Sequence, residues 1–222
     1  MPTPSQQASG LLVLPALFIA ALVSLPLVVT LLSLAQPAGP IWEHLRDTVL
    51  NEYLLNTLAL MMLTGALSLL LGVSTGWLIG ACQFRGRATL SWLLMLPLAS
   101  PAYIVAYVYT DLLEVSGPVQ TTLRSWLSLG INDLQFPPIR NLTGAAVLLS
   151  LVLYPYIYLL CRNSFAGRSG VQFDAARVLG HGPFSAFFRV ALPAARPAIV
   201  GGLALVLMET LADFGVVSYF SV

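Results

Sequence analysis

Long stretches without a charged residue are the feature that most constrains this chain. Four of them hold no Asp, Glu, Lys or Arg: residues 11–35, 57–82, 88–110 and 141–161. Each has about the 20 residues that a helix needs to cross roughly 30 Å of hydrocarbon. A fifth apolar run begins at Pro197 and continues towards Val222, interrupted by Glu209 and Asp213. In lipid the backbone must satisfy its own hydrogen bonds, so these runs predict an all-α, polytopic transmembrane helical bundle with about five spans.

The low charge content excludes a soluble globular domain. Only 9% of the residues are charged, whereas a soluble domain usually carries about 25%. A signal peptide is the competing interpretation of the first apolar run, and it would need a basic region before a short apolar core. Residues 1–10 contain no Arg or Lys, and the run is too long. We therefore expect a retained first span at 11–35 after an N-terminal tail at 1–10.

The arginines predict the orientation of the spans. All ten basic residues are arginines. Seven lie in the loops 83–87 and 162–196, and three lie in the loops 36–56 and 111–140. Loops rich in basic residues face the cytoplasm in membrane proteins. The N-terminal tail is therefore expected in the cytoplasm, with the spans alternating in direction.

Two prolines interrupt the third apolar run. Pro97 and Pro101 are four residues apart, so they lie one turn apart on a helix and would bend it at nearly the same place. Membrane helices tolerate such breaks where neighbours or water satisfy the freed backbone groups. One interpretation is ordinary helix shape. The other is a broken helix that lines a translocation pathway.

A helix-turn-helix is predicted in the arginine-rich loop between the fourth and fifth runs. Asp174 suits the first turn of a short helix, where a carboxylate complements the helix dipole, and Ala175 and Ala176 leave one face small. Gly180 can end this helix in a left-handed conformation. Pro183 can begin a second one, to which Phe184, Phe187 and Phe188 would give an apolar face before Leu192 and Pro193 end it.

This loop resembles the coupling motif of the permease subunits of binding-protein-dependent ABC importers. The family pattern is Glu-Ala-Ala, three residues, Gly, nine residues and Ile-x-Leu-Pro. The chain matches it at the family spacing through Ala175, Ala176, Gly180, Leu192 and Pro193. It departs conservatively at Asp174 and Val190. The resemblance implies a partial permease core at residues 54–222, with a coupling loop at 163–196.

In such permeases this loop docks into a cleft of a separate ATPase. By resemblance, the coupling role falls on Asp174, Ala175, Ala176, Gly180, Leu192 and Pro193. The absence of lysine agrees with this division of labour, because a P-loop needs a lysine to reach the nucleotide phosphates. The chain itself is then expected to hold no cofactor and no metal site and to be no enzyme, with ATP and magnesium bound by the partner.

The resemblance also implies the partners and the location. The expected partners are a dimer of ATP-binding subunits, a periplasmic or lipid-anchored substrate-binding protein, a second permease half and membrane lipid, with no nucleic acid. The expected location is the bacterial cytoplasmic (inner) membrane, as a multi-pass protein.

Two further stretches resemble the iron(III) importer permeases. They are residues 96–111, which begin Leu-Pro-Leu-Ala-Ser-Pro, and residues 208–220, which begin Met-Glu-Thr-Leu-Ala-Asp. This resemblance implies iron(III) as the substrate, although polyamine, thiamine and sulfate importers share the architecture. The iron permeases usually carry two homologous halves in one chain, so we expect this chain to be a fragment covering most of the first half.

Glu209 and Asp213 are carboxylates inside the fifth apolar run. Each costs about 2.5–3.5 kcal/mol near the bilayer centre, so they should face protein or water. They are four residues apart, so a continuous helix would place them on one face. They would then either line the translocation pathway together with Pro97 and Pro101 and attract a hard cation, or make a polar contact that fixes helix packing or the partner half.

Two other function classes remain as alternatives. A membrane-embedded enzyme would need a catalytic constellation, and the chain contains neither His-Glu-x-x-His nor Gly-x-Ser-x-Gly. A secondary transporter would run on an ion gradient without ATP, and the coupling motif would then have no purpose.

Overall fold

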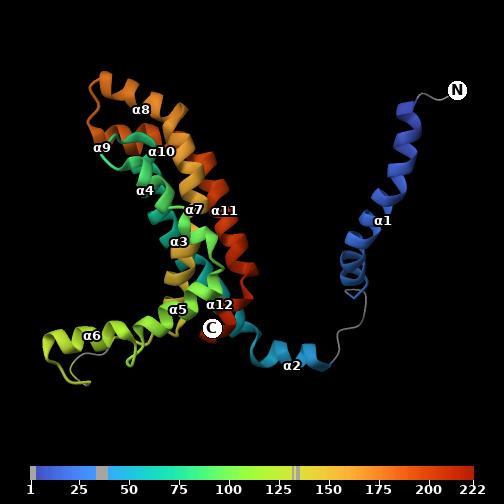
Figure 1. Ribbon diagram of the computed structural model, residues 1–222, viewed down its shortest axis with the longest axis horizontal. Coiled ribbons are helices and arrows are strands. Elements are labelled where there is room, and N and C mark those ends of the chain that lie inside the picture. The colour runs from blue at the N-terminus through green and yellow to red at the C-terminus, as the bar shows by residue number, and fades with distance from the viewer. Residues whose placement is uncertain (1–3, 34–39, 132, 134–135) are drawn as a thin grey trace. The chain divides into compact units, whose positions relative to one another are not determined.

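We describe the protein from a computed structural model, in which residues 4–33, 40–131, 133 and 136–222 are described (Figure 1). Within these ranges every regular element is a helix. The chain divides into two compact units, Met1–Asn51 and Glu52–Val222. The first unit holds helices α1 (Pro4–Ser33) and α2 (Pro40–Thr48). Residues 1–3 of the expected tail and 34–35 of the expected first span lie outside the described residues.

The number of apolar helices agrees with the sequence. Among the described residues, three helices are long and apolar enough to cross a membrane: Val13–Ser33 within α1, α3 (Leu50–Ala81) and α7 (Leu142–Ala166). The number rises to five if each of two bent helix pairs is one span. The all-α, multi-span fold class is therefore confirmed.

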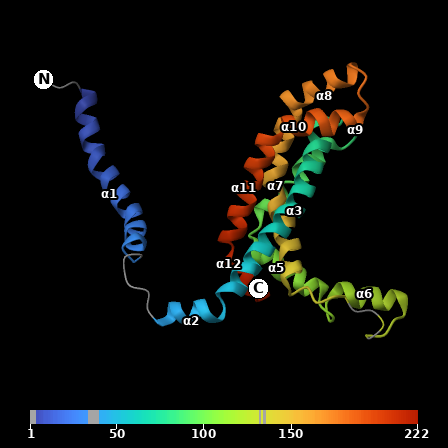
Figure 2. The ribbon, with the colours of Figure 1, turned by 180° about the vertical axis from the view of Figure 1, so that it is seen from behind.

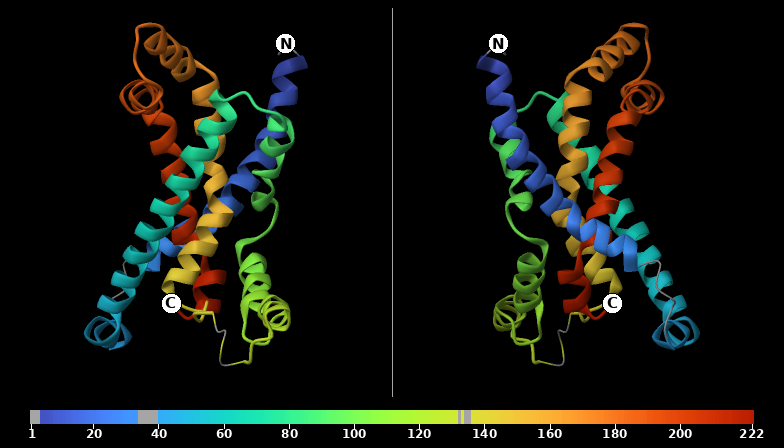
Figure 3. Two further views of the ribbon diagram at one scale, coloured as in Figure 1. Left: turned by 90° about the vertical axis from the view of Figure 1, so that its left-hand side faces the viewer. Right: turned by 90° about the vertical axis from the view of Figure 1, so that its right-hand side faces the viewer.

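The third apolar run is broken at its prolines. It forms α4 (Arg87–Leu93), the short 3₁₀ helix η1 (Leu96–Ala99) and α5 (Ala102–Leu113). Pro101 precedes α5 in an extended conformation, with φ −57° and ψ 137°. Segment Arg87–Ala99 is bent by 98° relative to segment Ala102–Leu127, and Figure 3 shows the separate helical pieces. The break is much sharper than the curvature of an ordinary helix, because proline cannot continue the backbone hydrogen bonds.

The fifth apolar run is also broken. Helix α11 (Arg196–Ala212) ends at Asp213, and α12 (Phe214–Phe220) follows at once. Asp213 is extended, and its carboxylate accepts a hydrogen bond of 2.7 Å from the backbone N–H of Val216. The expectation that Glu209 and Asp213 share the face of one helix is therefore wrong, because the aspartate caps the next helix instead of continuing the first.

Helix α7 forms the centre of the second unit. It contributes most of the buried apolar side chains: Ala145, Ala146, Leu148, Leu149, Val152, Leu153 and Ile157. Ile157 lies between two glycines. A Cβ added to Gly72 of α3 would be 2.6 Å from its Cβ, and one added to Gly202 of α11 would be 2.8 Å from its Cα. Small residues let membrane helices approach closely, so these glycines fix how α3 and α11 pack on α7.

The remaining helices of the second unit lie at the two ends of this bundle (Figures 1 and 2). One end carries α4 together with α8 (Arg168–Val178), α9 (Pro183–Ala186), the π-helical segment η2 (Phe187–Ala191) and α10 (Leu192–Ala194). Both arginine-rich loops lie here, so we call it the arginine-rich end. The opposite end carries α6 (Pro118–Leu127).

Candidate functional site

The predicted turn at the arginine-rich end is formed by Gly180. Its φ is 91°, in the left-handed region that glycine enters without steric cost. The N–H of Gly180 donates to the carbonyl of Arg177, and the N–H of His181 donates to the carbonyl of Ala176, each at 3.1 Å. This pair of bonds is the Schellman motif that ends a helix on glycine. The glycine cap expected from the sequence is therefore present.

The second helix of the pair begins at Pro183, as the sequence indicated. Proline suits this first position because the N–H that it lacks would have no helical partner there. The helix then continues through η2 into α10 and does not end at Leu192 and Pro193, which lie within α10. The segment Pro183–Ala194 finally bends by 66° into α11. Helices α8 to α10 thus form the helix-turn-helix of residues 168–194.

Asp174 has a different place from the one expected. Helix α8 begins at Arg168, directly after Gly167 has ended α7, so Asp174 lies in the middle of α8 and not in its first turn. Its carboxylate is therefore too far from the first turn to act on the helix dipole. Asp174 is exposed to the surroundings.

The two alanines of the motif point in different directions. Ala175 is exposed and Ala176 is 6% exposed, so only one of them is free for a partner. Gly180 is exposed, and Leu192 and Pro193 are partly buried. Of the six residues assigned to coupling by resemblance, Asp174, Ala175 and Gly180 are thus exposed, whereas Ala176, Leu192 and Pro193 are buried or partly buried.

Of the large apolar side chains beside the turn, the sequence singled out only Phe184, as part of the apolar face of the second helix, and not Val178 or Leu179. Val178, Leu179 and Phe184 flank the turn and are 87%, 81% and 79% exposed. Exposed apolar groups that lie together mark interaction sites. Their signal in the sequence was the presence of bulky apolar residues next to a glycine turn in an arginine-rich loop. We call these three residues the turn patch.

An aromatic cluster joins the helix-turn-helix to the spans. The indole of Trp77 on α3 contacts three phenylalanine rings edge to face: Phe165 on α7 at 5.1 Å, Phe173 on α8 at 4.7 Å and Phe187 on η2 at 4.7 Å between centroids. Such pairs contribute about 0.5–1.5 kcal/mol each beyond their buried area. The Trp77 cluster therefore links both arms of the helix-turn-helix to two different spans.

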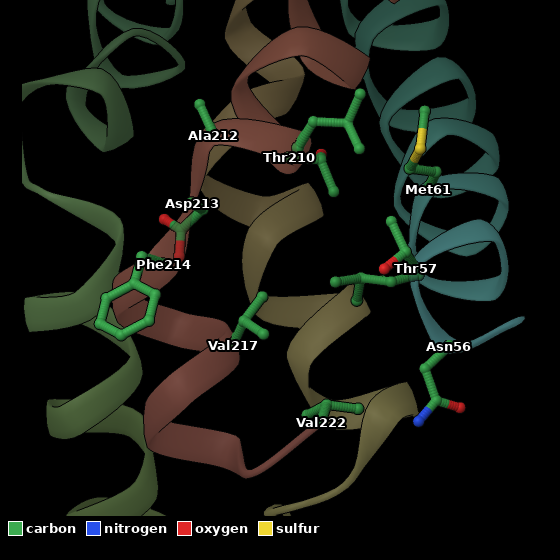
Figure 4. Close-up of a pocket in the computed structure, with 11 residues that line it drawn as sticks. Asn56, Thr57, Met61, Thr210, Ala212, Asp213, Phe214, Val217 and Val222 are labelled. Atoms are coloured by element: carbon green, nitrogen blue, oxygen red, sulfur yellow. The ribbon is translucent and has the colours of Figure 1, made fainter. Parts of the chain in front are cut away.

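A pocket lies at the break between α11 and α12 (Figure 4). Its volume is about 240 Å³, and its lining is Asn56, Thr57, Leu60, Met61, Thr210, Leu211, Ala212, Asp213, Phe214, Val217 and Val222. Figure 4 shows Asp213 and Val217 across the pocket from Thr57 and Met61. It is a small, mainly apolar recess with one carboxylate at its edge.

Of the four residues that were expected to line a pathway, one lies at this pocket. Asp213 lines the pocket, whereas Glu209, Pro97 and Pro101 are not among its lining residues. Glu209 is partly exposed on α11. Within the described ranges, no three or more His, Cys, Asp or Glu side chains gather where they could hold a metal ion.

The family model that matches the chain is described as "Binding-protein-dependent transport system inner membrane component" and covers residues 69–221. This range takes in the helix-turn-helix, the Trp77 cluster and the helix break at Asp213. The chain belongs to this family. With its apolar helices, this inner membrane component is a multi-pass membrane protein.

Individual relatives are named for several substrates. The molybdenum transport system permease protein ModB of Escherichia coli K12 is 28% identical over 148 residues, which cover 67% of this chain and 62% of ModB. The spermidine/putrescine permease protein PotB of the same strain is 28% identical over 176 residues, with 78% and 62% covered. The sulfate permease protein CysT is 23% identical over 209 residues, with 92% and 72% covered.

The chain spans about three fifths of the length of ModB and PotB, at 62% of each. These relatives are transport permeases and not enzymes, in line with the interpretation of the sequence. Their names concern molybdenum, polyamines and sulfate. The iron(III) permeases that the sequence resembles in two stretches are not among them.

Proposed function

We propose that this chain is a membrane-spanning subunit of an ATP-driven, binding-protein-dependent importer. In this proposal the helix-turn-helix of residues 168–194 receives the movement of a partner ATPase. The observation that carries it is the Trp77 cluster, which connects an exposed apolar turn to α3 and α7 through aromatic contacts of 4.7–5.1 Å.

The turn patch forms the contact with the ATPase in this scheme. Val178, Leu179 and Phe184 bury their apolar surface in the partner, and Asp174, Ala175 and Gly180 lie beside them. When ATP closes the partner dimer, the turn moves. Because the aromatic rings are closely packed, Phe173 and Phe187 transmit that displacement to Trp77 and so to α3. The spans then alternate between outward and inward access, while ATP and magnesium stay on the partner.

The remaining partners follow from the same mechanism. A substrate-binding protein delivers the substrate on the periplasmic side, and a second permease half completes the pathway. The arginine-rich end faces the cytoplasm, which agrees with the distribution of basic residues. In this orientation the helix-turn-helix meets the compartment that holds ATP, and the N-terminus is cytoplasmic.

The proposed substrate is iron(III). Support comes from the resemblance of residues 96–111 and 208–220 to iron(III) permeases and from the two carboxylates of the last run, Glu209 and Asp213. Carboxylates repel oxyanions such as molybdate and sulfate and attract hard cations. With a single carboxylate at the pocket, the cation would pass and not be held.

A charge introduced into the turn patch tests the partner contact. Leu179→Asp, at an 81% exposed position, should abolish co-purification with a co-expressed ATP-binding subunit while the permease still inserts. Val171→Asp is the matched control, because Val171 lies on the same helix, is 70% exposed and is outside the patch. Equal retention of the ATPase by both variants would overturn the proposal.

Uptake by proteoliposomes tests the energy source and the substrate. The complete transporter with its binding protein should accumulate ferric iron with ATP inside the vesicles, and a proton or sodium gradient should not replace ATP. Molybdate, sulfate and putrescine serve as competing substrates. Uptake of molybdate or putrescine without iron would reject the iron assignment but keep the importer, whereas gradient-driven uptake would reject the importer itself.

A further inference from the structure

Helix α6 (Pro118–Leu127) turns its apolar side away from the protein. Val119, Leu123 and Trp126 recur at intervals of four and three residues, so they share one helix face. Val119 is 38% and Trp126 82% exposed, and the adjoining Leu127 is 57% exposed. In a water-soluble protein this stripe would be packed against the core, so its exposure needs another explanation.

The side of the helix that is buried is a polar one, formed by Gln120 and Arg124. Gln120 and Arg124, one turn apart, are 1% and 8% exposed. The amide nitrogen of Gln120 donates to the carbonyl of Leu113 at 2.8 Å, and an Nη of Arg124 donates to the carbonyl of Val115. The same Nη donates to Oε1 of Gln120 at 3.1 Å. These bonds orient α6 through its polar face.

The accepting carbonyls explain this orientation. Leu113 is the last residue of α5, and Val115 follows two residues later. The last carbonyls of a helix have no partner within that helix and need one elsewhere. Gln120 supplies it for Leu113, and Arg124 binds the carbonyl of Val115 just beyond the helix, so both side chains fasten α6 to the end of α5. The apolar stripe must then face outwards.

The membrane surface is the environment that fits such a helix. Figures 1 and 2 show α6 running across the direction of α7, at the end of the bundle opposite the arginine-rich loops. Tryptophan is enriched where membrane meets water, and helices with one apolar face lie in that plane. Thr121, Thr122 and Ser125 give α6 a polar side for water, and no acidic residue stands in its first turn.

We propose that α6 is an interfacial helix that lies in the lipid headgroup region of the membrane leaflet opposite the arginine-rich end. Val119, Trp126 and Leu127 enter the boundary with the acyl chains, and lipid is the occupant of the exposed stripe. Through Gln120 and Arg124, α6 holds the end of α5 at a fixed depth in the membrane. The same contacts fix one side of the proline break. The inference does not depend on the substrate.

Single spin labels can test the position of α6 in the complete transporter, reconstituted in phosphatidylethanolamine–phosphatidylglycerol vesicles. Labels are attached to cysteines that replace Val119 or Trp126 on the apolar face, and Thr121 or Ser125 on the polar face. Cys82 is replaced by serine, whereas Cys161 is fully buried and stays. The measurement is the ratio of collisions with oxygen, which enters lipid, to collisions with a water-soluble nickel chelate.

In the absence of the binding protein, we expect the ratio of oxygen collisions to nickel-chelate collisions to be several-fold higher at positions 119 and 126 than at positions 121 and 125. Equal, low ratios on both faces would place α6 in water and overturn the proposal. Low ratios that change only when the binding protein is added would also overturn it, in favour of a protein partner. As a second measurement, brominated lipids should quench Trp126 fluorescence, and Trp126→Phe should lose that quenched component.

Discussion

The indole of Trp77 on α3 and the ring of Phe187 on η2 meet edge to face, with 4.7 Å between their centroids. The two residues come from a span and from the second arm of the helix-turn-helix. Phe173, on the first arm, contacts the same indole at 4.7 Å. A displacement of either arm therefore acts on one side chain of α3, which makes Trp77 the most direct test of mechanical coupling.

Replacing Trp77 with alanine should separate ATP hydrolysis from transport. The substitution removes three aromatic contacts worth about 0.5–1.5 kcal/mol each, so the turn can still bind the ATPase but no longer moves α3 with it. We expect substrate uptake per ATP hydrolysed in proteoliposomes to fall at least several-fold. Trp92→Ala is the control, because Trp92 is 73% exposed on α4 and should leave the ratio unchanged. Similar ratios for the two variants would argue against the cluster.

Gly180→Ala should weaken binding of the ATPase by straining the turn. A residue with a Cβ costs about 1–2 kcal/mol in the left-handed conformation, and Gly180 has φ 91°. Gly182→Ala is a close control, since Gly182 has φ −62° and an added Cβ meets nothing within 4 Å at either position. Affinity for the ATP-binding subunit, measured in detergent, should fall only for Gly180→Ala. A loss shared by both variants would point to the loss of glycine flexibility instead.

Gly202→Ala should destabilise the packing of α11 on α7, whereas Gly201→Ala should not. The added Cβ would lie 2.8 Å from Cα of Ile157 at position 202 but 3.7 Å from the nearest atom at position 201. Overpacking of this kind typically costs about 1–3 kcal/mol. Thermal unfolding in detergent measures the difference between the two variants. Unchanged midpoints for both would show that α11 can move away from Ile157 freely.

Two substitutions at Asp213 distinguish its cap from its charge. Asp213→Asn keeps an oxygen that can accept from the N–H of Val216, so α12 should keep its stability, while Asp213→Ala removes the cap at about 1 kcal/mol. If the carboxylate attracts a cation, uptake should fall in both variants, although only the alanine variant unfolds more easily. Normal uptake by the asparagine variant would limit Asp213 to a structural role.

Local features were the ones that the sequence determined. The apolar runs predicted the spans, because crossing lipid depends on length and composition alone. The breaks near Pro97 and Pro101 and the glycine turn at Gly180 also follow from the backbone of single residues. The coupling motif, which is a pattern of spacing, led to the family that the family model then matched.

Contacts between distant segments were decided only by the tertiary structure. Nothing in the sequence around Trp77 indicates that it meets Phe173 and Phe187, because that depends on how α3 packs against the helix-turn-helix. Asp213 could equally have continued a helix, and its role as a cap depends on where the chain turns to form α12. Likewise, the sequence of α6 predicts an amphipathic helix but does not indicate which of its faces packs against the protein. The bonds from Gln120 and Arg124 to the end of α5 determine which face is left outside.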